Sequence, residues 1–275
     1  MATLDIANRY LAAAPVIVTS PTTRCGTTLV QRLLSASDNA FIYGEEIGNQ
    51  ARVLTSLFLN QIGHWETQGP ASDQAFGRAL DGDLDEWRPA LAPPSEVMLK
   101  AWSETYYQLP MALAEFGRSI GRPIWGFKWP GAAPEMARGL MALMPKSKLI
   151  YVTRDLADAL KSAKARRFVR TAQDVDGFCA QWARHMSAFA QLPDNGRIAR
   201  VRYEGSRFED DLNTLTLRAG ATVDTRLDWQ VSKDWGVFVA AENLSNTALE
   251  TGQTADHVKS YDEPRVIRFG FKFRG

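Results

Sequence analysis

A loop of small and hydroxyl-bearing residues with one arginine follows a short apolar run near the N-terminus, where residues 17–29 read IVTSPTTRCGTTL. The β-branched run at residues 16–18 favours a strand, and from Thr27 the apolar residues recur with helical spacing. A strand, loop and helix of this kind direct free backbone N–H groups and the positive end of the helix dipole at an anion. Arg24 adds forked charged donors, and Gly26 permits a close backbone approach. This stretch therefore predicts a phosphate or sulfate site.

Two later segments carry cationic side chains at the ends of apolar runs. In residues 151–162, YVTRDLADALKS, Arg154 ends the run and Ser162 follows eight residues later. In residues 123–130, PIWGFKWP, a predicted buried strand ends near Lys128. This lysine either reaches solvent past its apolar stem or points at the crevice where α/β sheets bind ligands.

Two kinds of titratable side chain stand out among the remaining residues. Glu45 and Glu46 are adjacent carboxylates, a pattern typical of the charge pair at a helix start. His185 has no nearby carboxylate in sequence, which favours a core or groove histidine over a base.

The elements around these residues alternate between strands and helices up to about residue 205, which predicts an α/β fold with a mostly parallel, P-loop-like sheet flanked by helices. Residues 69–94 are rich in proline and glycine and predict short helices and loops. The other expected elements are strands at residues 16–18, 123–130 and 148–153, and helices at residues 4–14, 49–65, 155–168 and 175–192.

Composition limits the partners. The 275 residues include 32 basic and 31 acidic side chains, so no global field attracts nucleic acid or an anionic membrane. Cys25 and Cys179 have neither metal-ligand nor disulfide-framework spacing, and no metal is expected. With no basic leader and no apolar stretch of about 18 residues, a cytoplasmic location is expected.

Two motifs together resemble a known family. IVTSPTTRCGTTLVQRLL is similar to the 5′-phosphosulfate loop of sulfotransferases that use 3′-phosphoadenosine 5′-phosphosulfate, especially the tyrosylprotein-sulfotransferase-like branch with its PRSGTTL loop. YVTRDLADALKS resembles the 3′-phosphate motif of the same enzymes. The resemblance covers about residues 14–205 and implies that nucleotide as co-substrate. The residues implied to bind it are Arg24, Cys25, Gly26, Thr27, Thr28, Arg154, Ser162 and Tyr203.

The resemblance also implies catalytic roles. Glu46, the second glutamate of the GEE motif, would be the general base, Lys128 would neutralise charge on the leaving oxygen, and Arg24 would bind a sulfuryl or phosphate oxygen. Cys25 replaces the usual serine, Thr23 replaces a proline, and Gly48 stands where the relatives carry an arginine. The acceptor, a hydroxyl-bearing small molecule or peptide, therefore stays open.

A nucleotide kinase or P-loop NTPase is the main rival for the anion loop. That class requires G-x-x-x-x-G-K-[ST], and the loop lacks both the first glycine and the lysine before the hydroxyl. A donor with an already activated sulfuryl group needs no magnesium site, so the sequence favours sulfuryl transfer.

The last part of the chain has a different pattern. Residues 215–231 alternate apolar and polar side chains, as do residues 235–241 and 266–273, which predicts an antiparallel β-meander of about three strands. The amino-acid sequence from residue 201 onward resembles the last strands of TonB-dependent outer-membrane receptors.

Two units are therefore expected: a sulfotransferase-like α/β domain at residues 1–205, and a β-rich extension at residues 206–275 resembling the end of an outer-membrane barrel. One alternative to the enzyme is a non-catalytic fusion whose C-terminal strands associate with a membrane or another sheet edge. Another is a truncated product that exposes apolar strands. Membrane association is expected only through these strands.

Overall fold

A computed structural model describes residues 14–83, 91–192, 196–204, 207–208, 216–230, 235–253 and 258–273. The strands are β1 (Val16–Ser20), β2 (Ala40–Tyr43), β3 (Ile124–Pro130), β4 (Lys148–Thr153), β5 (Ile198–Glu204), β6 (Arg207–Phe208), β7 (Thr216–Leu217), β8 (Gly220–Gln230), β9 (Trp235–Glu242), β10 (Glu250–Gln253), β11 (Lys259–Tyr261) and β12 (Val266–Phe273). The helices are α2 (Thr27–Ser35), α3 (Glu45–Leu80), α4 (Ser95–Ser119), α5 (Pro134–Leu143), α6 (Leu156–Ala165) and α7 (Ala172–Ala190).

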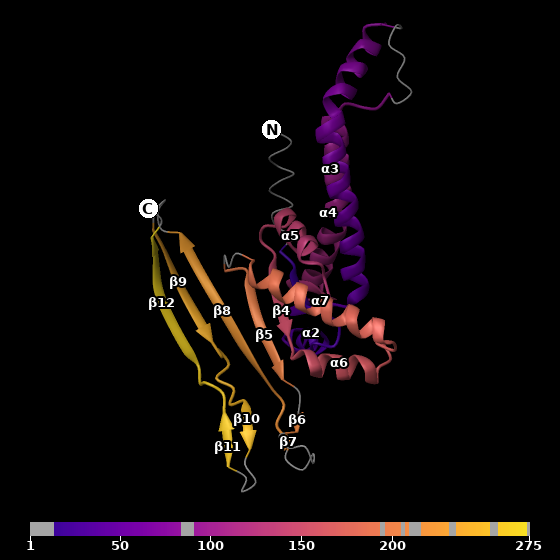
Figure 1. Cartoon of the computed structure of the whole chain (residues 1–275). Coiled ribbons are helices and arrows are strands. Elements are labelled where there is room, and N and C mark those ends of the chain that lie inside the picture. The colour runs from indigo at the N-terminus through magenta and orange to yellow at the C-terminus, as the bar shows by residue number, and fades with distance from the viewer. Residues whose placement is uncertain are drawn as a thin grey trace.

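One eight-stranded sheet has the order β12-β9-β8-β5-β4-β1-β3-β2, as seen in part in Figure 1. Neighbours among β5, β4, β1, β3 and β2 pair in parallel, whereas β8, β9 and β12 pair antiparallel. The predicted α/β class with a C-terminal antiparallel meander is therefore confirmed. Because the parallel strands share one direction, the residues that follow β1, β3 and β4 lie at the same edge of the sheet.

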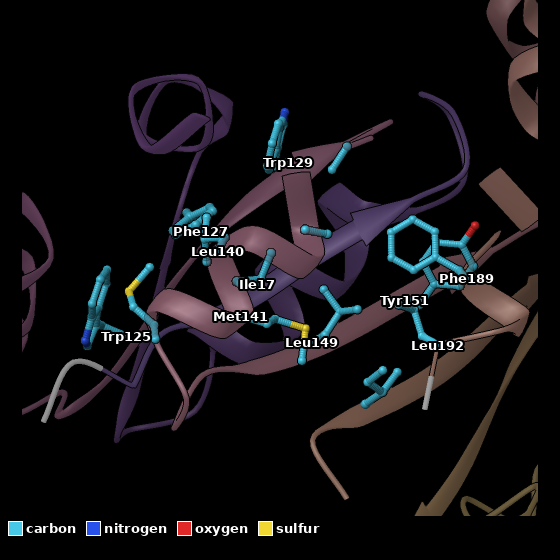
Figure 2. Packing of buried hydrophobic residues seen from close by; sticks show 14 of the residues in the cluster. Ile17, Trp125, Phe127, Trp129, Leu140, Met141, Leu149, Tyr151, Phe189 and Leu192 are labelled. Atoms are coloured by element: carbon cyan, nitrogen blue, oxygen red, sulfur yellow. The ribbon is translucent and has the colours of Figure 1, made fainter. Parts of the chain in front are cut away.

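Apolar residues cover both faces of the parallel strands because side chains alternate along each strand. Val18 on β1 packs with Ile42 and Val152 against the α2 side, while Ile17 belongs to the larger cluster on the other face. Figure 2 shows that larger cluster, in which Trp125, Phe127 and Trp129 of β3 are labelled. Tyr151 of β4 stacks on Phe189 of α7, with ring centres 4.2 Å apart.

Helices α3 and α4 lie side by side as a long hairpin that projects away from the sheet (Figure 1). The expectation of short helices and loops across residues 69–94 is wrong for its first part, because α3 continues through Pro70 to Leu80. Contact with α4 supports this continuation, since Asp73 accepts hydrogen bonds from the Ser95 backbone and hydroxyl at the start of α4. Of the expected helix at residues 4–14, residues 4–13 lie outside the described part of the chain. No helix in the described ranges has the length and apolar character needed to cross a bilayer.

Three C-terminal strands, β8, β9 and β12, extend the main sheet, whereas β10 and β11 form a separate two-stranded sheet. On β5, Ala199 lies opposite Thr225 of the antiparallel β8, while β5 also pairs in parallel with β4. The alternation predicted for residues 215–231 is interrupted, because β7 ends at Leu217 and joins a separate two-stranded sheet with β6 before β8 begins. The division of the chain at residue 205 stays a prediction, and the main sheet runs across it.

Candidate functional site

The predicted anion loop connects the end of β1 to the start of α2. Two of its residues have left-handed backbone conformations, Arg24 with φ 70° and Gly26 with φ 99°. A left-handed non-glycine residue costs about 1–3 kcal/mol and is typical of ligand-binding segments. The turn leaves Gly26 as the N-cap of α2, and its carbonyl accepts the N–H groups of Leu29 and Val30.

The start of α2 is open to an anion. As a glycine, the N-cap has no side chain that could accept from the N–H groups of Thr27 and Thr28. Among the described helices, α2 is also the one whose first turn contains no acidic residue. At the start of α6, by contrast, the Asp155 side chain accepts the first backbone N–H groups. A negative ligand would therefore meet unpaired donors and a positive dipole end at α2.

Gly26 also allows Tyr203 of β5 to approach this turn. A Cβ atom added at Gly26 would lie 3.2 Å from the Tyr203 ring, a contact tighter than most real ones. The same ring lies beneath the guanidinium of Arg154, with Cζ 5.2 Å from the ring centre. Tyr203 thus connects the loop after β1 with the residue that follows β4.

A pocket of about 250 Å³ opens between these elements. It is lined by Thr23, Arg24, Gly26, Thr27, Thr28, Leu29, Glu45, Pro130, Arg154, Phe168 and Tyr203. Six of the eight predicted nucleotide-binding residues are in this group. Cys25 and Ser162 are not, although both neighbour it.

Arginine side chains link the two predicted phosphate-binding segments. Nε of Arg24 donates to Oγ of Ser162 on α6 at 3.1 Å, and a terminal nitrogen of Arg154 donates to the Arg24 carbonyl at 3.3 Å. The structure therefore brings together residues that lie 130 and 138 positions apart in the sequence. Nε of Arg154 is buried and has no hydrogen-bond partner among the described residues.

Lys128 is a buried lysine at the end of β3, with 7% of its surface exposed. Its Nζ donates to Oγ1 of Thr28 at 2.9 Å and lies 2.8 Å from Oε1 of Glu45. A buried ammonium needs such partners because desolvation penalises an isolated charge. The lysine thus points toward the start of α2, as expected of a ligand-facing residue, instead of reaching freely into solvent.

The two glutamates of the GEE motif have different surroundings. Glu45, the first residue of α3, lines the pocket and pairs with Lys128. Glu46 is exposed, is not among the lining residues, and accepts a hydrogen bond from Gln50 at 3.4 Å. Sequence reasoning missed the contribution of Glu45, because adjacent helical residues point about 100° apart and the exact helix start decides which one faces the pocket.

Cys25 places its side chain inside the protein. Its sulfur lies 3.5 Å from Oγ1 of Thr22, and the residue has no exposed surface. Burial raises the pKa of the Cys25 thiol, against the opposing effect of hydrogen bonds with Thr22. Any contact of Cys25 with a ligand would therefore come from its backbone.

Helix α7 supplies side chains that the sequence did not single out as site residues. Gln181 donates to the Pro21 carbonyl and Trp182 to the Arg154 carbonyl. His185 is buried, as expected of a core or groove histidine, and its Nδ1 has no hydrogen-bond partner among the described residues. Burial lowers the pKa of His185, and the nearby Arg184 charge lowers it further.

Among the described residues, no group of three His, Cys, Asp or Glu side chains is arranged to hold a metal ion.

A family model described as "Sulfotransferase family" matches residues 15–206. One similar solved structure is titled "Crystal structure of TT1252 from Thermus thermophilus", with 13% sequence identity, coverage of 74% of this chain and 92% of that chain, and a TM-score of 0.33. No curated protein matches the chain. The family match ends where the C-terminal strands begin, so their resemblance to outer-membrane receptors stays a prediction.

Proposed function

The chain belongs to the sulfotransferase family, and we propose that it transfers a sulfuryl group from 3′-phosphoadenosine 5′-phosphosulfate to a hydroxyl acceptor. One observation carries the choice of donor. Arg24 at the open start of α2 and Arg154 after β4 line one pocket, and Nε of Arg24 donates a hydrogen bond to Ser162 of the predicted 3′-phosphate motif. A ligand with anionic groups at both its 5′ and 3′ positions matches two such linked donor sets.

The residues present fit this nucleotide. Thr27 and Thr28 offer backbone N–H groups without intrahelical acceptors, and Arg24 adds charged donors beside them for the 5′ end. On the 3′ side, the orphaned Nε of Arg154 marks a guanidinium whose hydrogen bonds are incomplete. The absent side chain of Gly26 leaves room for the Tyr203 ring, so that both residues line the pocket proposed for the nucleotide.

The donor supplies an already activated sulfuryl group, so the protein's task is positioning and charge stabilisation. We assign Lys128 to stabilise negative charge on the leaving oxygen, with Thr28 and Glu45 holding its ammonium in place. We assign Glu46 as the base that takes the proton from the acceptor hydroxyl, because Glu45 is already committed to the ion pair. Both glutamates lie in the first turn of α3, and Glu45 lines the pocket.

The acceptor in this proposal is a small molecule or peptide whose hydroxyl is attached to an apolar body. Leu29 and Phe168 line the pocket, with 43% and 62% of their surfaces exposed. Exposed apolar side chains at a pocket favour ligands that cover them.

Calorimetric titration with 3′,5′-adenosine bisphosphate tests the donor assignment. We expect the full chain to bind this product and Arg154→Ala to bind it at least about 10-fold more weakly, since a charge-assisted hydrogen bond is removed. Arg138→Ala is a matched control, because Arg138 lies exposed on α5 and pairs with Glu135. Absence of binding to the wild type at millimolar nucleotide would refute the proposed donor. Equal affinity of wild type and Arg154→Ala would refute only the 3′-phosphate assignment.

A further inference from the structure

Helix α7 contacts the main chain of both predicted phosphate-binding segments with consecutive residues. Nε2 of Gln181 donates to the Pro21 carbonyl at 3.2 Å, in the loop that precedes Arg24. Nε1 of Trp182 donates to the carbonyl of Arg154 itself at 3.3 Å. Backbone carbonyls beyond the ends of strands need partners outside the sheet ladder, and α7 provides them for both segments.

The same side of α7 is firmly fixed to the sheet. Phe189 is 1% exposed and stacks on Tyr151, and the Thr171 and Asp174 capping box closes the start of the helix. Gln181 also fills the space beside Gly131, where an added Cβ would lie 2.9 Å from its Nε2. A rigid helix therefore presents the two donors.

These hydrogen bonds connect α7, the anion loop and the residue after β4 to one another. Gln181 holds the start of the anion loop, Arg154 donates to the Arg24 carbonyl at the far end of that loop, and Trp182 holds Arg154. Moving either donor would change the separation of the two arginines. Two arginine-containing segments that both contact one helix suit a ligand whose two anionic groups are a fixed distance apart.

We propose that Gln181 and Trp182 are positioning residues that set the separation between the 5′ and 3′ anion-binding segments, Gln181 acting on the 5′ side and Trp182 on the 3′ side. This inference rests on the proposed nucleotide site. Neither side chain lines the pocket, so each acts through the backbone that it holds.

The test compares three probes by calorimetry: adenosine 5′-phosphate, adenosine 3′-phosphate and 3′,5′-adenosine bisphosphate. Trp182→Phe should weaken the 3′-phosphate and the bisphosphate by about 2- to 10-fold, the weight of one hydrogen bond, and leave the 5′-phosphate unchanged. Gln181→Met should weaken the 5′-phosphate and the bisphosphate and leave the 3′-phosphate unchanged. A purely structural role would weaken all three probes together.

Matched controls separate lost hydrogen bonds from lost packing. Trp102→Phe removes a buried indole N–H that has no partner among the described residues, and Gln191→Met removes an amide that donates to Oγ of Ser187 on α7. Both should leave all three affinities unchanged. If Trp182→Phe does not fold, Gln181→Met decides the inference by itself.

The outcomes distinguish this inference from the function on which it rests. A wild type that binds no probe overturns the proposed function and this inference together. A wild type that binds the bisphosphate, with variants that weaken all probes equally or none, overturns only the positioning roles. Selective loss on the predicted side supports them.

Discussion

Replacing Gly48 by alanine should destabilise the protein through a clash at the base of the site. Gly48 is buried in the first turns of α3 and packs against the end of β3. A Cβ atom there would lie 2.8 Å from the Lys128 carbonyl oxygen and 2.9 Å from Cβ of Trp129, closer than real Cβ atoms approach such neighbours. Because a backbone atom is involved, the helix or the strand would have to shift.

The magnitude follows from two opposing effects. Overpacking a well-packed site costs about 1–3 kcal/mol. Alanine in place of glycine within a helix gains about 0.5–1 kcal/mol. Gly63→Ala isolates the second effect, because Gly63 lies in the same helix with nothing within 4 Å of the added Cβ. We therefore expect Gly63→Ala to be more stable than the wild type, and Gly48→Ala to have a free energy of unfolding about 1–3 kcal/mol lower than that of Gly63→Ala.

Urea unfolding of the two variants and the wild type measures these free energies. The slope of the unfolding free energy against urea should stay the same in all three proteins, so that midpoints report stability. Equal stability of Gly48→Ala and Gly63→Ala would contradict the close packing of α3 on β3. The ion pair of Glu45 on α3 with Lys128 on β3 crosses the same contact between helix and strand.

Three further predictions concern the site. Glu46→Gln should lower sulfuryl-transfer turnover by about 10²–10⁴-fold and change the free energy of unfolding by less than about 0.5 kcal/mol. Glu45→Gln should also destabilise the fold in urea unfolding, because it leaves the ammonium of Lys128 without its ion-pair partner. Equal stability losses in the two variants would contradict the assigned roles. Since the folded-state pKa of His185 is lowered below 6.5, the unfolded chain binds more protons below that pH. The difference in unfolding free energy between the wild type and His185→Gln should therefore become smaller as pH falls from about 7 to 5. A difference in urea midpoints that stays constant over this pH range would refute this reasoning. A thiol-reactive chromophore should label the partly exposed Cys179 before the buried Cys25, with C179A as the control; rapid labelling of C179A would show that the Cys25 thiol is accessible.

The parallel half of the fold could be predicted because its signals are local. Apolar runs gave the central strands, and small residues marked the turn that enters α2. The continuation of α3 through Pro70 could not be read this way, because contacts with α4, remote in sequence, offset the cost of a proline inside a helix. The same holds for the edge pairing of β5 with β8, which adds the meander to the main sheet.

The candidate site was predictable only where side chains carry charge or belong to a motif. Arg24 stood out as the charged residue of the small-residue loop after β1, and Arg154 and Lys128 stood out by their charge near the ends of β4 and β3. Gln181 and Trp182 resemble ordinary residues of an amphipathic helix, and their role depends on backbone carbonyls that no sequence pattern marks. The choice between adjacent glutamates depends on helical phase, which a sequence fixes only to within a residue or two.

Transfer of radiolabelled sulfate from 3′-phosphoadenosine 5′-phosphosulfate to a panel of phenolic, alcoholic and tyrosyl-peptide hydroxyls tests the central claim most directly. The wild type should label at least one acceptor and release 3′,5′-adenosine bisphosphate in equal amount, and Lys128→Met should lose this activity. A folded wild type that binds the nucleotide but labels no acceptor of the panel would contradict the claim.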